Sequence, residues 1–181
     1  YSWILSCRNF MNACESILGL NPYQGGKPIK ELERELGLKN VIKLASNENP
    51  LGASLKVVEA MKLSLKEVHR YPDGNGYELK KSISGHLDVA TEMISLGNGS
   101  NELLELVARV FVCKKTDEVI FSQYAFVVYP LVTQALGATA KVAPAKEYGH
   151  DLNAMLELIN DNTKLIFVAN PNNPTGTLVS D

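Results

Sequence analysis

A glycine-containing loop at residues 97–102 (GNGSNE) carries groups that could bind a small anion. It joins a short predicted strand to a helix. The helix would begin with the backbone N–H groups of Ser100, Asn101 and Glu102, where the helix dipole favours an anion, most simply a phosphate. The loop is neither a dinucleotide-binding pattern, because Glu102 replaces the third glycine, nor a P-loop. A plain strand-to-helix turn with Ser100 as N-cap explains this loop equally well.

A second loop, at residues 170–176 (NPNNPTG), follows a run of apolar residues. Pro174 disfavours a helical conformation for Asn173 and so fixes the direction of that residue. Open α/β sheets bind ligands at the carboxyl ends of their strands. A rigidly aimed amide there could donate a hydrogen bond to a ring hydroxyl or phenolate. A bare Asn-Pro step would indicate only a turn, whereas the whole string after such a strand favours binding.

Aromatic residues near predicted turns are weaker candidates. Tyr124 follows another strand end and could stack on a planar cofactor, although an aromatic core or interface residue is commoner. Tyr71 precedes the turn at residues 71–76 (YPDGNG), where its hydroxyl could reach a phosphate, or it is a surface tyrosine. The polar loop at residues 44–52 (LASNENPLG) could line a pocket or cap the next helix.

Strand and helix signals alternate along the second half of the chain. Apolar spacing and capping residues predict helices over 27–38, 54–68, 77–87, 100–112, 126–137 and 151–160, with Ser54 and Asp151 as N-caps. Strands are predicted over 41–46, 93–96, 117–123, 138–145 and 164–171, the last of them buried on both faces.

This order predicts an α/β fold, a three-layer sandwich whose mostly parallel sheet is covered by helices on both faces. We expect an N-terminal arm and helix over residues 1–40 and the first part of a large domain over residues 41–181. Since the last clear element is a central-looking strand with its loop, we expect the chain to be the first half of something longer.

Composition excludes several classes of protein. The chain has 181 residues, 45% of them hydrophobic, and a formal net charge of −2, so it has no basic footprint for nucleic acid. Cys7, Cys14 and Cys113 form no C-x-x-C pair, which argues against a metal or redox motif. Polar residues interrupt the mildly apolar first twenty positions, so we expect neither a signal peptide nor a membrane span. The three histidines are scattered, and we expect them to be structural or at the surface.

Six segments, in this order, resemble the N-terminal half of the histidinol-phosphate aminotransferases. These are fold-type I enzymes that depend on pyridoxal 5′-phosphate (PLP). The resemblance runs from about residue 21 to residue 176 and rests on NPYQGGKPIKELERELG, KLASNENPLG, RYPDGNGYELK, SLGNGSNELLELV, SQYAFVVYPL and NPNNPTG. NPTG alone marks the wider aminotransferase superfamily, whereas the NPYQ, SNENPLG and RYPD strings point to the histidinol-phosphate branch.

The resemblance implies three contacts to PLP within one subunit. Asn173 matches the asparagine that hydrogen-bonds the phenolic oxygen, and Tyr124 matches the aromatic residue stacked on the pyridine ring. Ser100, Asn101 and Glu102 match the backbone stretch that holds the phosphate.

Three further tyrosine and asparagine positions are implied outside that set. Tyr71 matches a tyrosine that reaches across a homodimer interface to the partner's cofactor phosphate. Tyr23 and Asn47 match positions on the substrate side.

The resemblance also implies groups that cannot be assigned in this chain. The family needs a lysine that forms a Schiff base with PLP, an aspartate at the pyridinium nitrogen, and arginines for the anionic groups of the substrate. All of these lie C-terminal to NPTG in the family, so we expect the lysine beyond Asp181. We therefore expect residues 1–181 alone to be inactive.

The implied reaction is amino transfer between L-histidinol phosphate and 2-oxoglutarate, which gives imidazole-acetol phosphate and L-glutamate in histidine biosynthesis. A cytoplasmic homodimer is implied as well, with small-molecule substrates. A threonine-phosphate decarboxylase or an aromatic aminotransferase on the same fold stays an alternative, as do a non-catalytic α/β module that binds phosphate or a nucleotide, and an inert fragment.

Overall fold

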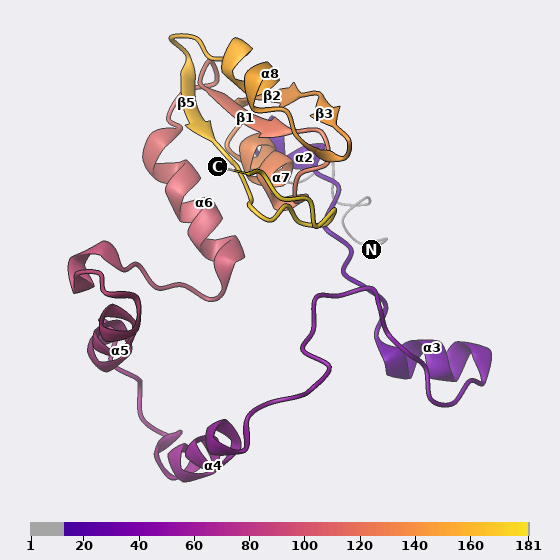
Figure 1. The fold of residues 1–181 in the computed structure, drawn as a ribbon, viewed down its shortest axis with the longest axis vertical. Coiled ribbons are helices and arrows are strands. Elements are labelled where there is room, and N and C mark those ends of the chain that lie inside the picture. The colour runs from indigo at the N-terminus through magenta and orange to yellow at the C-terminus, as the bar shows by residue number, and fades with distance from the viewer. Residues whose placement is uncertain (1–12, 181) are drawn as a thin grey trace. The chain divides into compact units, whose positions relative to one another are not determined.

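The computed structural model describes residues 13–180, which form two compact units (Figure 1). One unit combines residues 13–23 with residues 97–180, and the other holds residues 24–96. The predicted division at residue 40 stays a prediction. Cys7 and most of the segment considered as a signal peptide lie outside the described residues. Among the described residues, no helix has the length and apolar character needed to cross a membrane.

The first unit is built on a three-stranded parallel sheet in the order β2-β1-β5. Its strands are β1 (Glu118–Ser122), β2 (Thr139–Ala143) and β5 (Thr163–Ile166). Strand β1 pairs with β2 along its whole length, from Glu118 opposite Thr139 to Ser122 opposite Ala143. A short antiparallel hairpin, β3 (Ala145–Lys146) and β4 (Gly149–His150), follows β2.

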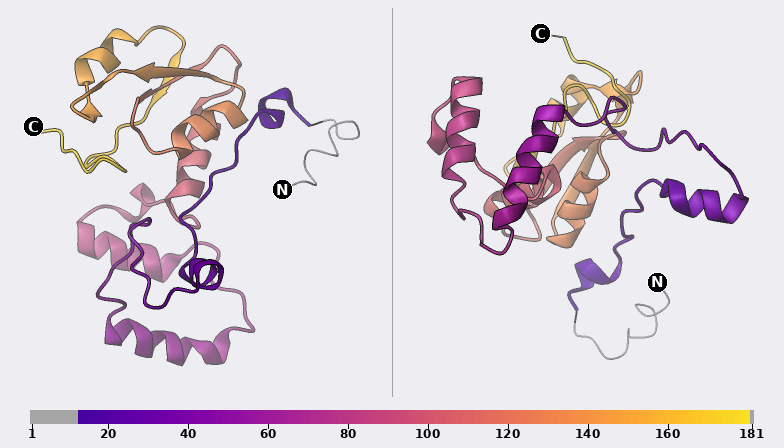
Figure 2. Two further views of the ribbon diagram at one scale, coloured as in Figure 1. Left: turned by 90° about the vertical axis from the view of Figure 1, so that its right-hand side faces the viewer. Right: turned by 90° about the horizontal axis from the view of Figure 1, so that it is seen from below.

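Helices cover both faces of this sheet (Figure 2). On one face, Val119 and Phe121 of β1 lie in a cluster with Tyr129 of α7 (Val128–Ala135), and α6 (Ser100–Phe111) adds Ala108 to the same layer. On the other face, Ile120 packs against Met155 of α8 (Leu152–Glu157). All five residues of β1 are therefore buried. The predicted three-layer α/β arrangement is confirmed.

The prediction that the strand near residues 164–171 is buried on both faces was wrong for the described sheet. Strand β5 lies at one edge of that sheet, and the side chains of Lys164 and Ile166 are exposed. Leu165 packs against the clusters that contain residues of α6 and α7, whereas Lys164 and Ile166, which alternate with it along the strand, stay exposed. The fully buried strand is β1.

The second unit contains only helices and loops among its described residues. They are α3 (Ile29–Leu36), α4 (Leu55–Ser64), the 3₁₀ turn η1 (Leu65–Glu67), α5 (Tyr77–Leu87) and the 3₁₀ turn η2 (Thr91–Met93). The predicted end of α3 is confirmed, because Gly37 adopts the left-handed conformation at φ 64°. Ser54 takes the N-cap position of α4 as predicted, although its side chain makes no capping hydrogen bond.

Two strand predictions near this unit were wrong. The predicted strands at residues 41–46 and 93–96 are absent: residues 41–46 and 94–96 are in no strand, and Met93 is the last residue of η2. Both segments contain residues that favour strands, but a strand requires a hydrogen-bonded neighbour. The sheets in the described part of the chain consist of β1, β2 and β5 and of β3 and β4, and neither includes these segments.

Candidate functional site

Tyr124 lies in the loop that leaves the carboxyl end of β1. Its side chain is 40% exposed, so the ring is only partly covered by the protein. The ring of Tyr148 lies 5.3 Å away, centroid to centroid, with an angle of 39° between the two planes. Tyr148 belongs to the turn between β3 and β4 and has a positive φ of 63°. Sequence reasoning missed this second tyrosine, because nothing in the local motif marks a turn residue as a neighbour of Tyr124.

The loop after β5 is tied to the Tyr124 loop by Asn172, which is 4% exposed. The Nδ2 group of Asn172 donates to the backbone oxygen of Tyr124 at 3.0 Å and to Oγ1 of Thr175 at 2.7 Å. The backbone closes the same loop, since the N–H of Gly176 donates to the oxygen of Asn172 at 2.8 Å. We call Asn172 with its two side-chain hydrogen bonds the Asn172 bridge.

Asn173, the residue singled out from the sequence, follows the Asn172 bridge directly. It is partly exposed, whereas its neighbour Asn172 is buried. Two other asparagines of the loop are used within the protein: Asn172 in the bridge, and Asn170, whose side chain binds the backbone of Val179 at 2.9 and 3.2 Å. The loops that carry Tyr124 and Asn173 are thus held together at one edge of the sheet, as parallel strands β1 and β5 require.

The N-terminus of α6, predicted to bind an anion, has no side-chain cap. Gly99 is the N-cap residue at φ 82°, a conformation that favours glycine, and it provides no side-chain cap. The N–H groups of Ser100, Asn101 and Glu102 begin the helix and have no acceptor within it. Ser100 is the first helical residue and not the N-cap, so the alternative explanation of this loop was wrong in that detail.

The side chain of Glu102 turns back over the start of α6. Its Oε2 atom accepts hydrogen bonds from the backbone N–H of Asn98 at 2.6 Å and from Nδ2 of Asn98 at 3.3 Å. This contact fixes the loop at residues 97–99 against the helix. The contribution of Glu102 to an anion site would therefore come from its backbone, because its carboxylate is negatively charged.

Two predicted residues, Asn47 and Tyr71, belong to the second unit and are exposed. The turn after Tyr71 is fixed by Asp73, whose carboxylate accepts the N–H groups of Tyr77 at 2.7 Å and Asn75 at 2.9 Å. These two hydrogen bonds, that from Tyr77 above all, hold the pKa of Asp73 below its ordinary value. Tyr71 thus precedes a defined turn and presents its side chain to solvent.

Tyr23, the remaining predicted residue, belongs to the first unit. Its ring packs edge-on against Phe126, with 6.4 Å between the centroids, and 54% of the residue is exposed. His150, expected to be structural or at the surface, is half-buried and binds the backbone oxygen of Ala169 through Nε2 at 2.8 Å. This contact joins the β3–β4 hairpin to the loop after β5.

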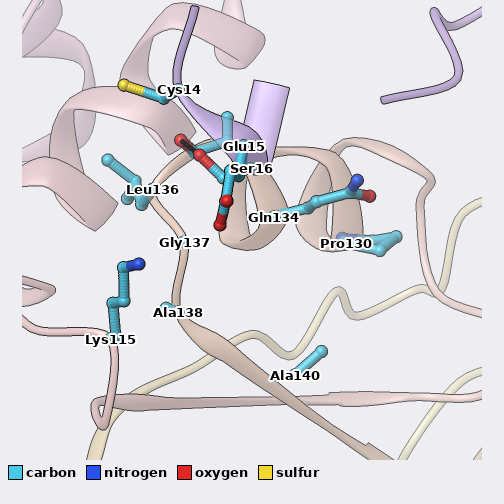
Figure 3. Close-up of a pocket in the computed structure, with 11 residues that line it drawn as sticks. Cys14, Glu15, Ser16, Lys115, Pro130, Gln134, Leu136, Gly137, Ala138 and Ala140 are labelled. Atoms are coloured by element: carbon cyan, nitrogen blue, oxygen red, sulfur yellow. Dashed lines mark hydrogen bonds between the residues drawn. The ribbon is translucent and has the colours of Figure 1, made fainter. Parts of the chain in front are cut away.

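A separate open groove of about 1150 Å³ lies where α2 (Glu15–Leu18) contacts α7 (Figure 3). Its lining includes Ser16, Lys115, Gln134 and Ala138. Lys115 precedes β1 and Ala138 precedes β2, so the groove is at the amino ends of the strands. Tyr124 and Asn173 follow the carboxyl ends, and the groove is therefore distinct from the loops described above.

The sequence pattern of the family described as aminotransferase class I and II matches residues 39–181. The chain belongs to this family. Among curated proteins, the chain is 61% identical over 161 residues to histidinol-phosphate aminotransferase 1 of Idiomarina loihiensis, covering 89% of the chain and 44% of that protein. It is 55% identical over 165 residues to histidinol-phosphate aminotransferase 1 of Mannheimia succiniciproducens, covering 91% and 45%. The chain thus spans less than half the length of these relatives.

Solved structures show the same fold. A histidinol-phosphate aminotransferase from Sinorhizobium meliloti, in complex with pyridoxal-5′-phosphate, superposes with a TM-score of 0.80 at 25% identity, covering 91% of the chain and 44% of that structure. An aromatic aminotransferase from Pyrococcus horikoshii superposes with a TM-score of 0.69 at 21% identity, covering 83% and 43%. The described part of the chain therefore has the fold of the PLP-dependent aminotransferases, as predicted.

Proposed function

We propose that the full-length protein is a histidinol-phosphate aminotransferase. It transfers the amino group of L-histidinol phosphate to 2-oxoglutarate and yields imidazole-acetol phosphate and L-glutamate, a step of histidine biosynthesis. The observation that carries the proposal is the 61% identity over 161 residues to a relative of that name. Since the chain covers less than half of such relatives, the proposal concerns the complete protein and not residues 1–181 alone.

PLP is the proposed cofactor, and the geometry of the first unit fits it. The start of α6 offers backbone N–H groups to a phosphate, which is the group that helix N-termini bind most readily. The partly exposed ring of Tyr124 offers a flat surface to a pyridine ring. The loop after β5 brings Asn173 to the same edge of the sheet as Tyr124. When bound, PLP supplies the electron sink for removal of a proton from the substrate carbon that carries the amino group.

Each of these residues has a defined part in the proposal. The N–H groups of Ser100, Asn101 and Glu102 bind the phosphate, Tyr124 stacks on the ring, and the Asn173 amide donates to the phenolic oxygen. That last hydrogen bond favours the ionised phenolate over the phenol, because a donor next to an oxygen stabilises its negative charge.

The remaining site residues act on the substrate side and between subunits. We propose that Tyr23 and Asn47 line the substrate site and that Tyr71 reaches the cofactor phosphate of a second subunit in a homodimer. A cytoplasmic location belongs to the same proposal. The exposure of Tyr71 supports the proposed contact with a second subunit, because a side chain that does not pack within its own subunit can contact another.

Amino transfer by the purified full-length protein tests the function. With PLP, L-histidinol phosphate and 2-oxoglutarate, we expect glutamate to accumulate in a one-to-one ratio with imidazole-acetol phosphate. Carbon dioxide released from threonine phosphate, with no glutamate formed, would replace the proposal by the decarboxylase alternative. Faster transfer from an aromatic amino acid than from histidinol phosphate would replace it by an aromatic aminotransferase.

A further inference from the structure

The Asn172 bridge joins the two loops that carry the proposed cofactor contacts. Asn172 donates from one amide nitrogen to the Tyr124 backbone, which belongs to the loop after β1, and to Thr175 of its own loop. The residue is 4% exposed, so these bonds are shielded from water. The loss of such partners costs more free energy for a buried amide than for a surface amide, because water cannot replace the partners.

The same loop is tied to the β3–β4 turn. Oγ1 of Thr175 lies 3.0 Å from Oγ1 of Thr177, and Oγ1 of Thr177 donates to the backbone oxygen of Tyr148 at 3.5 Å. Tyr148 in turn packs on the Tyr124 ring. A chain of side-chain hydrogen bonds therefore runs from the backbone of Tyr124, through Asn172 and two threonines, to the backbone of the residue whose ring covers Tyr124.

We propose that Asn172 is a positioning residue for cofactor binding, an inference that rests on the proposed function. It fixes the separation between the Tyr124 ring and the Asn173 amide, which must contact one planar ligand from two different loops. Asn172 itself is buried and would not touch the ligand. A ligand that contacts two loops binds more weakly when the loops move independently, because binding must then also order the loops.

A matched pair of variants in the full-length protein tests this role. Asn172→Ala removes the bridge between the loops, whereas Asn170→Ala removes two hydrogen bonds of the same loop that reach only Val179. We expect Asn172→Ala to raise the Kd for PLP about tenfold, which corresponds to the net free energy of about one hydrogen bond. Asn170→Ala should change that Kd less than about twofold. The near-ultraviolet circular dichroism of bound PLP should weaken in Asn172→Ala alone, because that signal depends on how the ring is held.

Asn172→Asp keeps the side-chain shape but has no N–H donor when ionised, so it should weaken PLP binding as the alanine variant does. Equal Kd values and equal dichroism in the wild type and both Asn172 variants would overturn the proposal. A loss of folding in both Asn172 variants, with Asn170→Ala intact, would also overturn it in favour of a purely structural role. If the wild type binds no PLP, the proposed function fails; if it binds and Asn173→Ala alone weakens binding, only this inference fails.

Discussion

Polar residues have different roles at the two ends of the parallel strands, which we call the amino edge and the carboxyl edge of the sheet. At the amino edge, Asp117 is 5% exposed, and its carboxylate accepts the backbone N–H groups of Cys113 and Lys114 at 2.7 and 2.8 Å. Glu118 accepts from Nδ2 of Asn160 at 2.7 Å and pairs with Lys141 at 3.3 Å. These polar groups bind one another, so this edge stabilises the fold.

At the carboxyl edge, a buried polar side chain holds loops whose other residues are partly exposed to solvent. Asn172 is buried and hydrogen-bonded, while the adjacent Asn173 and the ring of Tyr124 stay partly exposed. This contrast supports our proposal that the ligand binds at the carboxyl edge. Substitutions at the carboxyl edge should change binding, and those at the amino edge should change stability.

The largest effect is expected for Asn173→Ala at the carboxyl edge. It removes a hydrogen bond to a charged oxygen, which is worth about 1.5–3 kcal/mol, so the Kd for PLP should rise roughly 10- to 150-fold. The apparent pKa of the cofactor chromophore should rise too, since the phenolate loses a donor. Absorbance titrations of the full-length protein with PLP, repeated across pH, measure both. An unchanged Kd and an unchanged titration would remove Asn173 from the site.

A smaller effect is expected for Tyr124→Ala. The variant removes the stacking surface, and aromatic contacts contribute about 0.5–1.5 kcal/mol beyond buried area, so PLP should bind roughly 2- to 12-fold more weakly. Tyr124→Phe is the matched control, because it keeps the ring and loses only the hydroxyl. The same titration compares the two. If Tyr124→Phe weakens binding as much as Tyr124→Ala does, the hydroxyl matters and stacking does not.

Asp117→Asn should leave PLP binding unchanged and lower stability. The backbone N–H groups of Cys113 and Lys114 hold the pKa of Asp117 below its ordinary value of 3.8. A carboxylate with a lowered folded-state pKa stabilises the protein above the unfolded-state value and loses that contribution as pH falls through the folded-state pKa. The Tm difference between wild type and variant should thus be full at neutral pH and shrink below about pH 4. A Tm difference that grows as the pH falls, or a changed Kd for PLP in Asp117→Asn, would contradict the separate roles of the amino and carboxyl edges.

The sequence carries local signals for the candidate site residues, whereas two of its strand predictions failed. Asn173, Tyr124 and the start of α6 could be proposed from sequence because each has a local signal: an Asn-Pro step, an aromatic residue after a strand, and a glycine turn before a helix. Helix ends such as Gly37 were found for the same reason. Local signals of this kind act over a few residues, and the sequence displays them directly.

The features that were not predicted correctly depend on contacts between residues far apart in the sequence. Residues 41–46 have strand propensity without a strand neighbour, and β5 has an apolar sequence but an edge position. The hydrogen bond of Asn172 to the backbone of Tyr124 was not predicted, because the two residues are 48 positions apart. Tyr148 was missed for the same reason, since only the folded hairpin brings it to Tyr124.

A crystal structure of the full-length protein with PLP would test the proposed position of the cofactor. We expect the phosphate at the N–H groups of Ser100, Asn101 and Glu102, the pyridine ring against Tyr124, and the phenolic oxygen within hydrogen-bond distance of Asn173. PLP bound elsewhere, for example in the groove near Lys115 and Gln134, with the carboxyl edge of the sheet empty, would contradict it.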